Sequence, residues 1–548
     1  MDLNSLISTL LTNRGLTSPA AVSEFFHPPD PLQIPLSAVG LKPASIDSAV
    51  QLIKQHISRG HQIAVYGDYD VDGICSTAIL WENLHRLTPH VFPHIPHRRE
   101  EGYGLTRSGI DACLASHAQL IITVDNGIVA KDQIAYAKGQ GCDVIVIDHH
   151  ESGPSLPAAD AILHSTATCA AGLTWFFCRE LIKSPSLVKE GDTRQGEEVL
   201  DEQLSLVALA VVCDIIPLLG LNRSLVRFGL DRLKTTRRPG LLALFNLARI
   251  NPANLDTYHL GFVIGPRLNA MGRLEHALDS LRLLCTTSPS RAAQLAQTLE
   301  ATNRFRQQLT TDSTLHAVNQ ITAAYPHQLP KLLFVSDPSY DQGIIGLIAA
   351  KLVEKFYRPA IAVSVGDADS KASVRSVPGF HITDFLRSSS DLLVTVGGHS
   401  LAAGFTVLTR DLPALKDQIV SQAESLIPEN LLTRTSKYDL ELPGDFFASG
   451  LNLDLASKLA PFAPFGLGNP EPAFFTRAVP ISDPRRLGTD GRHLRFTAGP
   501  YPAIWFSAPP DVSASPLDII YRLGVDTYHQ PDSLQLVIKD IPAYASSR

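Results

Sequence analysis

Three short apolar runs in the first third of the chain each end in acidic or imidazole side chains. The runs are residues 62–67, 119–124 and 143–147, and their length and β-branched content predict buried strands. Helical stretches separate the runs, so we expect βαβ units and a parallel sheet whose strands all end at one edge. Open α/β sheets bind ligands at that edge, which is therefore the expected place of a functional site.

The polar groups at these strand ends are numerous and of few chemical kinds. They are carboxyl and imidazole side chains, at Asp68, Asp70, Asp72, Asp125, Asp148, His149 and His150. A further carboxyl, Asp214, follows residues 201–212, an apolar stretch that predicts a buried helix. Each strand end alone could be a turn whose Asp caps the next helix. Carboxylates gathered at one edge repel one another unless a cation neutralises them, so their coincidence predicts a metal site.

The donor types narrow the choice of metal. Carboxylates and imidazoles without thiolates favour Mn²⁺, with Mg²⁺ next and Zn²⁺ as an alternative. The donors outnumber the needs of one ion, so we expect two divalent ions. Paired ions are the usual solution for phosphodiester hydrolysis.

Charge and cysteine usage bear on partners and on cellular compartment. The 548-residue chain has a formal net charge of −7, which argues mildly against bulk electrostatic binding of nucleic acid but allows a local basic groove. The seven cysteines stand singly, without a C-x-x-C pair, so we expect reduced thiols in a cytoplasmic protein.

The residue pattern changes several times along the chain, which indicates several domains. A helical lead-in precedes the α/β pattern, residues 290–325 predict a long helix because they lack Gly and Pro, and a second α/β unit begins at residue 331. After about residue 436, short strand-like pieces alternate with Pro and Gly turns, as is typical of a small β-barrel. We therefore expect a multidomain α/β protein with a lead-in at 1–45, a catalytic domain at 46–285, a connecting helix at 286–328, a second α/β domain at 329–432 and an OB-like barrel at 433–548.

Together these residues resemble the DHH phosphoesterase superfamily, named for the triplet that Asp148, His149 and His150 form here. The resemblance extends to its RecJ-type exonucleases through further motifs in the expected order, at residues 67–73, 96–104, 123–127, 213–217, 265–274, 342–346, 373–379, 397–399 and 464–470. It implies a parallel-sheet DHH domain, a long connecting helix, a second α/β DHH-associated domain and a C-terminal β-barrel of the OB kind.

The resemblance also implies roles for individual residues. The two ions would be held by Asp70, Asp72, Asp125, His149 and Asp214. Asp125 would bridge them, His150 would contact the scissile phosphate, and Asp68 and Asp148 would support the catalytic groups. Phosphate or DNA would be bound by Arg98, Arg267, Asn269, Arg273, Ser373, Arg375, Ser376, Gly398 and His399. The alternatives are a salt bridge from each arginine to the acidic cluster, and a buried core position for His399.

The implied activity is 5′-to-3′ hydrolysis of single-stranded DNA to mononucleotides, in DNA repair and recombination. The implied partners are single-stranded DNA, a single-strand-binding protein and a helicase, for a monomeric chain. One rival is a DHH phosphodiesterase that acts on short oligoribonucleotides or cyclic dinucleotides, and another is an inactive replication scaffold. The barrel region favours the DNA enzyme over the first rival, and the intact acidic set argues against the second.

Three regions need separate comment. Tyr340 and Asp341 stand where related sequences usually carry an aromatic residue followed by His, and residues 151–172 lack an expected Asn-Pro-Lys-like stretch. In the last domain, basic residues alternate with aromatic ones as far as Trp505 and Phe506, which suits stacking on single-stranded bases. Burial of these two rings in the barrel core is the alternative.

Overall fold

The structure is a computed structural model that describes residues 3–102, 104–184, 187, 193–488, 491–509, 512, 515–526 and 533–542. Tyr103, within the motif at 96–104, lies outside the described residues. Contacts within the chain define two compact units. The first unit is Leu16–Arg304 with Phe462–Glu471, and the second is Met1–Gly15, Phe305–Pro461 and Pro472–Arg548.

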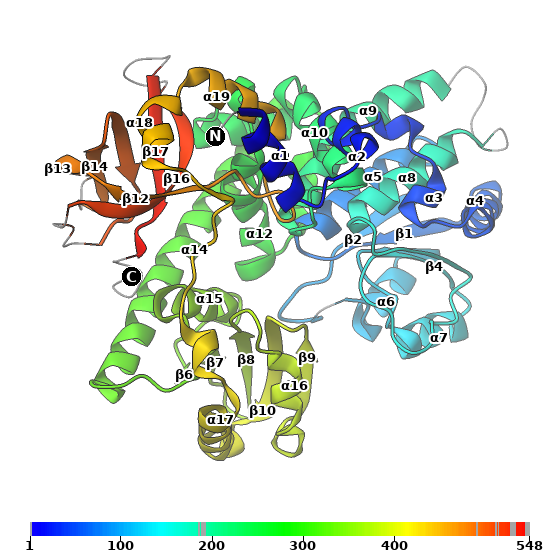
Figure 1. Ribbon diagram of the computed structural model, residues 1–548. Coiled ribbons are helices and arrows are strands. Elements are labelled where there is room, and N and C mark those ends of the chain that lie inside the picture. The colour runs from blue at the N-terminus through cyan, green and yellow to red at the C-terminus, as the bar shows by residue number, and fades with distance from the viewer. Residues whose placement is uncertain are drawn as a thin grey trace. The chain divides into compact units, whose positions relative to one another are not determined.

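A five-stranded parallel sheet is the frame of the first unit (Figure 1). In spatial order its strands are β2 (Val91–His94), β1 (Gln62–Tyr66), β3 (Ala118–Val124), β4 (Asp143–Asp148) and β5 (Ala161–His164). The three predicted strands are confirmed as β1, β3 and β4. The sequence pattern does not predict β2 and β5, because each has only 4 residues and ends in His, which is a weak strand signal.

Helices cover both faces of this sheet. Ile63 and Val65 of β1 belong to the larger core, whereas Ala64 and Tyr66 belong to a smaller one on the opposite face. The larger core is covered by α5 (Val71–His85), α8 (Ala170–Ile182) and α9 (Thr193–Cys213). The smaller core is covered by α6 (Arg107–Ala115) and α7 (Lys131–Gly139). Burial on both faces explains why the strand sequences are almost wholly apolar.

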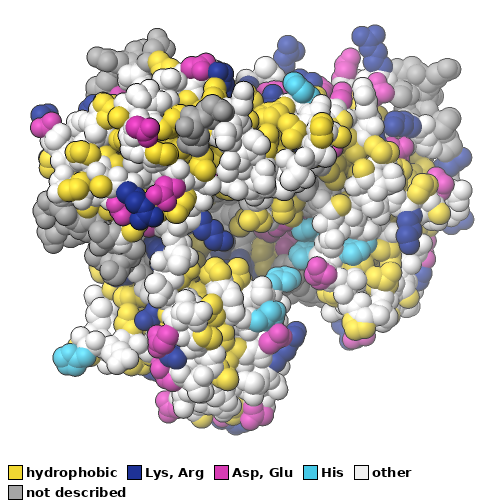
Figure 2. Space-filling model, viewed as in Figure 1, with side chains coloured by type: hydrophobic (Ala, Val, Ile, Leu, Met, Phe, Trp, Pro, Cys, Tyr) yellow, Lys and Arg dark blue, Asp and Glu magenta, His cyan; other side chains and the backbone are white. Residues whose placement is uncertain are grey.

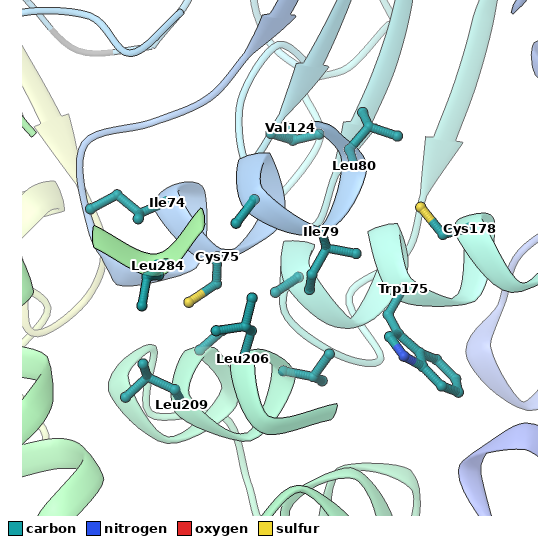
Figure 3. Packing of buried hydrophobic residues seen from close by; sticks show 14 of the residues in the cluster. Ile74, Cys75, Ile79, Leu80, Val124, Trp175, Cys178, Leu206, Leu209 and Leu284 are labelled. Carbon is teal, nitrogen blue, oxygen red and sulfur yellow. The ribbon is translucent and has the colours of Figure 1, made fainter. Parts of the chain in front are cut away.

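Helix α5 is buried along most of its length. Figure 3 shows Ile74, Cys75 and Ile79 of α5 in the core that Leu206 and Leu209 of α9 also enter. Burying one such aliphatic side chain contributes about 1.5–3 kcal/mol, and close packing leaves the helix little freedom to shift. The first turn of α5 is therefore held in a fixed position relative to the sheet.

The strand order creates a topological switch point beside β1. From β1 the chain crosses to β2 on one side and then returns to β3 on the other side of β1. Open α/β sheets bind ligands at the carboxyl ends of strands at such a point. Asp68 follows β1 and Asp125 follows β3, so both stand at the switch point.

Helices before β1 and after α9 complete the first unit. They are α2 (Pro19–Phe26), η1 (Pro31–Gln33), α3 (Leu36–Val39), α4 (Pro43–Ser58), α10 (Gly220–Lys234), α11 (Pro239–Ala248), η2 (Pro252–Asn254), η3 (His259–Ile264), α12 (Gly265–Leu274) and α13 (Leu278–Cys285). The predicted buried helix at 201–212 is confirmed within α9. Buried Arg223 ties Phe462 and Ala463 to this unit, donating to their carbonyl oxygens at 3.0 and 2.7 Å.

The second unit contains a mixed sheet in the order β6-β7-β8-β10-β9. The predicted strand, helix and strand are confirmed as β6 (Leu333–Asp337), α15 (Ile345–Phe356) and β7 (Ala360–Ser364). The other elements of this region are β8 (Asp369–Arg375), α16 (Ile382–Arg387), η4 (Ser390–Leu392), β9 (Thr395–Gly398), β10 (Ala402–Leu408), η5 (Thr409–Asp411), α17 (Leu412–Leu426) and η6 (Glu429–Leu432). The predicted long helix is α14 (Pro289–Ala324), which runs from the first unit into the second.

A seven-stranded sheet forms where the barrel is predicted, in the order β11-β12-β16-β17-β15-β14-β13. Its elements are β11 (Leu440–Glu441), α18 (Gly444–Gly450), α19 (Leu453–Leu459), η7 (Ala460–Phe462), β12 (Phe474–Val479), β13 (Ile481–Leu487), β14 (His493–Ala498), β15 (Tyr501–Trp505), β16 (Leu517–Asp526) and β17 (Ser533–Asp540). Trp505 is fully buried, so stacking of this ring on a base is excluded, whereas Phe506 is 53% exposed.

The lead-in is divided between the two units. Helix α1 (Leu3–Asn13) belongs to the second unit, where Arg14 just after it pairs with Asp439 at 3.1 Å. Helices α2 to α4 belong to the first unit, and α4 spans the boundary expected at residues 45 and 46. The five-part division of the chain stays a proposal.

On the face of the molecule shown in Figure 2, charged side chains of both signs are mixed and no single patch dominates. All seven cysteines are free, and five of them are buried. Within the described ranges, none of the helices combines the length and apolar character that crossing a membrane requires.

Candidate metal centre

The loop after β1 packs tightly against the start of α5. Asp70 is the N-cap of α5, and its Oδ1 accepts a hydrogen bond from the backbone N–H of Gly73 at 3.1 Å. A Cβ atom added to Gly73 would lie only 2.6 Å from the backbone N and O of Asp68. Glycine is therefore required here, and the tight turn brings Asp68, Asp70 and Asp72 to the carboxyl end of β1.

Asp125 follows β3 in the left-handed backbone region, with φ +65°. Asp and Asn tolerate this conformation better than other non-glycine residues. Its N–H donates to the Ile147 carbonyl at 3.0 Å, and the Asn126 side chain donates to the Val124 carbonyl at 3.0 Å. Gly127 continues the turn at φ +109°. These bonds hold the Asp125 carboxylate, which is 2% exposed, at the strand end.

The Nε2 atom of His149 lies among three carboxylates. It is 3.2 Å from Asp125 Oδ1, 3.6 Å from Asp72 Oδ2 and 3.6 Å from Asp214 Oδ2. Donors that bind one ion at about 2.0–2.2 Å lie roughly 3.0–3.6 Å from one another. The spacing of His149, Asp72 and Asp214 therefore fits a shared cation, and Asp125 adjoins this group through His149.

A second group of donors adjoins the first. Ligand atoms of Asp68, Asp70 and Asp125 lie within 4.8 Å of one another. The Oδ1 atoms of Asp68 and Asp125 are buried and accept no hydrogen bond. Buried oxygens without a partner are costly, and a cation would satisfy them. Because Asp125 groups with Asp68 and Asp70 and also lies beside His149, the residues fit two neighbouring ions with Asp125 between them.

Asp72 is oriented by the N-terminus of α8. Its Oδ2 accepts the N–H of Ala170 and its Oδ1 accepts the N–H of Ala171, both at 2.8 Å. The positive end of a helix favours a carboxylate in this position. Residues 151–172, which depart from the family pattern, thus still supply through their last residues the helix start that fixes a metal donor.

Asp148 binds the backbone and the ring of its own triplet. Its Oδ1 accepts the N–H of His149 at 2.8 Å and Nδ1–H of His150 at 2.8 Å, while Oδ2 accepts the N–H of Ile128 at 2.9 Å. Burial opposes ionisation of Asp148, but the hydrogen bond and charge of His150 outweigh it and lower the pKa of Asp148. Burial likewise disfavours charge on His150, yet Asp148 and then Asp214 raise the pKa of His150 to about 9. The Asp148 carboxylate thus favours the imidazolium form of His150.

Burial and mutual repulsion raise the pKa of several acidic side chains at the site. Burial, with repulsion from Asp70, raises the pKa of Asp68 to about 8. Burial, with repulsion from Asp72 and Asp70, raises the pKa of Asp214 to about 8. Burial is also the main cause that raises the pKa of Asp72 and of Asp125. Divalent cations would remove this penalty, so the electrostatics agree with the geometry.

Two arginines of the first unit flank Tyr69, which lies between Asp68 and Asp70. The Arg98 guanidinium carbon is 5.0 Å from the centre of the Tyr69 ring. Burial raises the pKa of Tyr69, while Arg98 and Arg273 both act to lower it. Helix α12, which carries Arg273, packs on this loop so closely that a Cβ added to Gly272 would lie 2.5 Å from the Tyr69 carbonyl oxygen.

Arg267 is held away from the acidic cluster. Its Nε donates to Glu300 Oε2 at 2.7 Å and its Nη1 to the Val263 carbonyl at 2.6 Å. The salt bridge thus joins α12 to α14, and its partner is not a metal donor. Asn269, two residues further along the same helix, is half-buried. Phosphate binding by these two residues stays a prediction.

The remaining predicted contacts lie in the second unit. Arg375 Nη1 donates to Ser373 Oγ at 3.2 Å on β8, and a Cβ on Gly346 would lie 3.1 Å from that oxygen. Asp341, at the other departure from the family pattern, accepts the N–H of Gly343 at 2.7 Å and so shapes the turn before α15. The absence of a side chain at Gly346, in the first turn of α15, lets its backbone approach the Ser373 and Arg375 side chains.

Ser376, Gly398 and His399 differ in their accessibility. Ser376 is 8% exposed and donates to the Phe380 carbonyl at 2.9 Å, a structural contact. Gly398 has φ +139°, and an added Cβ would lie 2.4 Å from the Ala402 carbonyl oxygen. His399 is exposed at the end of β9, so the interpretation of a buried core histidine is wrong.

Sequence reasoning assigned Asp68 a supporting role, and the structure places its carboxylate within ligand distance of Asp70 and Asp125, so a direct metal contact is an alternative role. Asp72 lies in the first turn of α5 and not in an extended segment, so the alternation of the three Asp residues does not by itself predict which carboxylates converge. No sequence pattern predicts the contacts that Tyr69 and the N–H group of Ala170 make at the site. Their contacts depend on how α12 and α8 pack against the loop.

Comparison with known protein families agrees with this arrangement. The model of the DHH family, N-terminal domain, matches residues 62–211. The DHHA1 domain matches residues 329–426, and the RecJ OB domain matches residues 438–540. The three matches follow the order of the parallel sheet, the mixed sheet and the seven-stranded sheet.

Individual relatives extend the similarity to nearly the whole chain. The single-stranded-DNA-specific exonuclease RecJ of Bacillus subtilis is 31% identical, with 98% of this chain and 68% of the relative aligned. The protein of the same name from Salmonella typhimurium is also 31% identical, over 98% of this chain and 96% of the relative. The crystal structure of RecJ from Thermus thermophilus in complex with Mn²⁺ superposes with a TM-score of 0.80 at 28% identity, covering 97% of this chain and 75% of that one.

Proposed function

The chain belongs to the RecJ family of DHH phosphoesterases, and we propose from this membership that it hydrolyses single-stranded DNA from the 5′ end, releasing mononucleotides with two divalent ions. The relatives are named single-stranded-DNA-specific exonucleases. The observation that carries the proposal is the sharing of Asp125 by two adjoining donor groups at the switch point of the parallel sheet.

Each ion has its own donors in this scheme. Asp72, His149 and Asp214 would hold one ion, Asp68 and Asp70 the other, and Asp125 both. Bound at this position, the ions would supply an activated water and stabilise the charge on the attacking and leaving oxygens. Burial lowers the pKa of His149, which keeps its imidazole in the neutral form that binds metal.

His150 and the arginines would act on the substrate directly. Because Nδ1 of His150 is committed to Asp148, Nε2 is the nitrogen that would donate to an oxygen of the scissile phosphate. Arg98 and Arg273 lie beside the acidic loop and offer planar donors to phosphate oxygens. In the second unit, Ser373, Arg375 and exposed His399 are candidates for further contacts with the strand.

The metal proposed is Mn²⁺, with Mg²⁺ as the alternative. All donors are carboxylates and imidazole, and the free cysteines of the chain stand outside the donor groups. Solved structures of the Thermus thermophilus relative are complexes with Mn²⁺ and with Mg²⁺. Both observations support an oxygen-rich site for hard or borderline ions.

The biological setting is proposed from family membership. We propose a cytoplasmic, monomeric protein that acts in DNA repair and recombination. Single-stranded DNA is the proposed substrate, and a single-strand-binding protein and a helicase are the proposed protein partners. Free thiols at all seven cysteines support a reducing compartment.

The test uses a 5′-phosphorylated DNA oligomer with a label at its 3′ end. Incubated with the protein and Mn²⁺, the labelled product should shorten stepwise, and EDTA should stop this. Blunt duplex DNA should remain intact. Hydrolysis of dinucleotides with an intact oligomer would instead indicate the small-substrate branch of the superfamily, and inactivity on both would indicate a scaffold.

A further inference from the structure

Two aromatic side chains lie exposed on one short segment of the first unit. The rings of Tyr258 and Phe262 stack, with centroids 5.2 Å apart and planes 25° from parallel. Tyr258 is 60% exposed and Phe262 72% exposed. Large apolar rings are mostly buried, and a contiguous exposed apolar patch is typical of a binding surface.

An uncommon backbone conformation presents these rings. Phe262 lies within η3 (His259–Ile264), a π-helical turn, and Tyr258 is its N-cap residue. Pro266 follows the turn and has no N–H to donate to the Phe262 carbonyl four residues earlier. The wider i→i+5 bonding of a π-helix avoids that missing bond, and such turns occur frequently at functional sites.

The π-helical turn is built against a metal donor. The Cys213 thiol donates to the Leu260 carbonyl at 3.6 Å, and a Cβ on Gly265 would lie 2.4 Å from the Cys213 sulfur. Asp214, a donor of the first metal group, is the next residue. Ile215 follows with φ +58° and is 67% exposed, so it adds to the apolar surface beside the centre.

The other end of the same segment leads to the proposed phosphate-binding residues. The turn continues directly into α12 (Gly265–Leu274), which carries Arg273 beside Tyr69. Within the first unit, the segment that carries the aromatic pair thus packs against Cys213, next to the candidate donor Asp214, and continues along the chain to Arg273. A nucleotide combines the two matching features, a phosphate and a flat apolar base.

We propose that Tyr258 and Phe262 form a stacking platform for one base of the strand whose phosphodiester lies at the metal centre. The proposal rests on the nuclease function proposed above and adds a base-binding subsite to it. Stacking holds any base because every base has a π face. A platform of this kind would position the strand for hydrolysis without selecting a sequence.

The test compares normal oligomers with oligomers that lack a single base. Single-turnover hydrolysis of 5′-phosphorylated single-stranded DNA is measured at increasing protein concentration, which separates half-saturation from the maximal rate. The substrates carry one abasic nucleotide, moved stepwise along the first nucleotides from the 5′ end. The proteins are the full chain, Phe262→Ala, Phe262→Trp, Tyr258→Ala and, as an exposed apolar control, Leu242→Ala.

For normal DNA, Phe262→Ala should raise the half-saturating concentration about tenfold, in the range expected for loss of one stacked base, with little change in maximal rate. Phe262→Trp should restore it, and Leu242→Ala should leave it unchanged. At one abasic position the unsubstituted chain should show the same weakening, and Phe262→Ala should add nothing further there. That non-additivity is specific to a contact between ring and base.

Three results would overturn the platform. One is unchanged half-saturation in Phe262→Ala and Tyr258→Ala. Another is an equal loss on normal DNA and on every abasic substrate, and the third is a loss matched by a fall in melting temperature, as expected if the rings pack on another part of the chain. In all three, hydrolysis by the unsubstituted chain would keep the proposed function intact. Absence of hydrolysis by that chain would instead reject the proposed function itself.

Discussion

Asp148 holds His150 through a 2.8 Å hydrogen bond between its Oδ1 and the Nδ1–H of the ring. The same oxygen accepts the N–H of His149, so one buried carboxylate positions both histidines of the triplet. The two residues also set each other's charge, because the pKa of Asp148 is lowered and that of His150 is raised to about 9. Within the triplet, Asp148 thus orients both histidines, and it leaves Nε2 of His150 available to the substrate.

Replacing Asp148 with Asn should test how far this carboxylate sets the charge of His150. Asn keeps the size of the side chain but removes the charge that raises the pKa of His150, so that pKa should fall. Loss of a supporting carboxylate of this kind typically costs about 10–100-fold in activity. If the imidazolium is the active form, activity should also be lost at a lower pH on the alkaline side.

The measurement is the maximal rate of single-stranded DNA hydrolysis as a function of pH, for the unsubstituted chain, Asp148→Asn and Asp132→Asn. Asp132 is exposed on α7, so its substitution serves as the control. An alkaline limb that stays in place in Asp148→Asn would show that His150 does not act as a protonated donor.

Metal-free protein should lose stability as the pH rises. Asp68 and Asp214 have pKa values of about 8 in the folded chain, against about 4 when unfolded, so the folded chain binds more protons between these values. The stabilisation is fully present below pH of about 4 and is lost as the pH rises through about 8. Raised pKa values of Asp72 and Asp125 act in the same direction.

The melting temperature in EDTA should therefore fall as the pH rises from roughly 6 to 9, across the upper pKa values of the cluster. The increase in melting temperature on addition of Mn²⁺ should grow over the same pH range, because the ion then displaces fewer protons. Asp214→Asn should flatten the fall in EDTA. A melting temperature that rises with pH in EDTA, or a Mn²⁺ effect independent of pH, would contradict the proposed protonation of the cluster.

Gly73→Ala should distort the acidic loop, since the new Cβ would lie 2.6 Å from the backbone of Asp68. Overpacking of a closely packed site typically costs about 1–3 kcal/mol. Gly139→Ala is the matched control, because nothing lies within 4 Å of its added Cβ and it ends helix α7. Gly73→Ala should unfold at a lower urea concentration and bind Mn²⁺ more weakly, whereas Gly139→Ala should be nearly unchanged in both. Equal behaviour of the two variants would mean that the loop is not tightly constrained.

Arg98 should contribute to substrate binding rather than to folding. Arg98→Gln should raise KM for 5′-phosphorylated single-stranded DNA about tenfold or more, the range for a charge-assisted phosphate contact. Arg107 offers a close control, because its guanidinium lies 5.2 Å from the Tyr136 ring, much as Arg98 lies 5.0 Å from Tyr69. Steady-state kinetics should show a KM effect in Arg98→Gln alone. An equal effect in Arg107→Gln would assign it to a general loss of positive charge.

The parallel sheet and the acidic edge could be predicted from sequence because both depend on local patterns. Apolar runs with polar groups at their ends predict β1, β3 and β4, and a stretch without Gly or Pro predicts α14. The short strands β2 and β5 lack that periodic signal and form only beside established neighbours. Their existence depends on pairing across the sheet, which sequence patterns do not report.

Individual roles at the site were harder to predict than the site itself. Asp68 and Asp70 are both plain Asp residues in one motif, and only the turn at Gly73 decides which carboxylates converge. Arg267 sits in a family motif, yet its charge is paired with Glu300, more than thirty residues along the chain. Trp505 follows basic residues as a base-stacking ring would, but the sheet buries it. Each difference arises from long-range packing.

The most direct test of the account is the single-turnover rate of 5′-nucleotide release by Asp125→Asn with saturating Mn²⁺. Asn preserves the shape of the side chain and tolerates φ +65°, so the fold should persist while both donor groups lose a shared charge. A loss of several kcal/mol of transition-state stabilisation predicts a rate at least about a thousandfold lower, with Asp132→Asn unaffected. A rate within tenfold of the unsubstituted chain would contradict a two-ion centre built on Asp125.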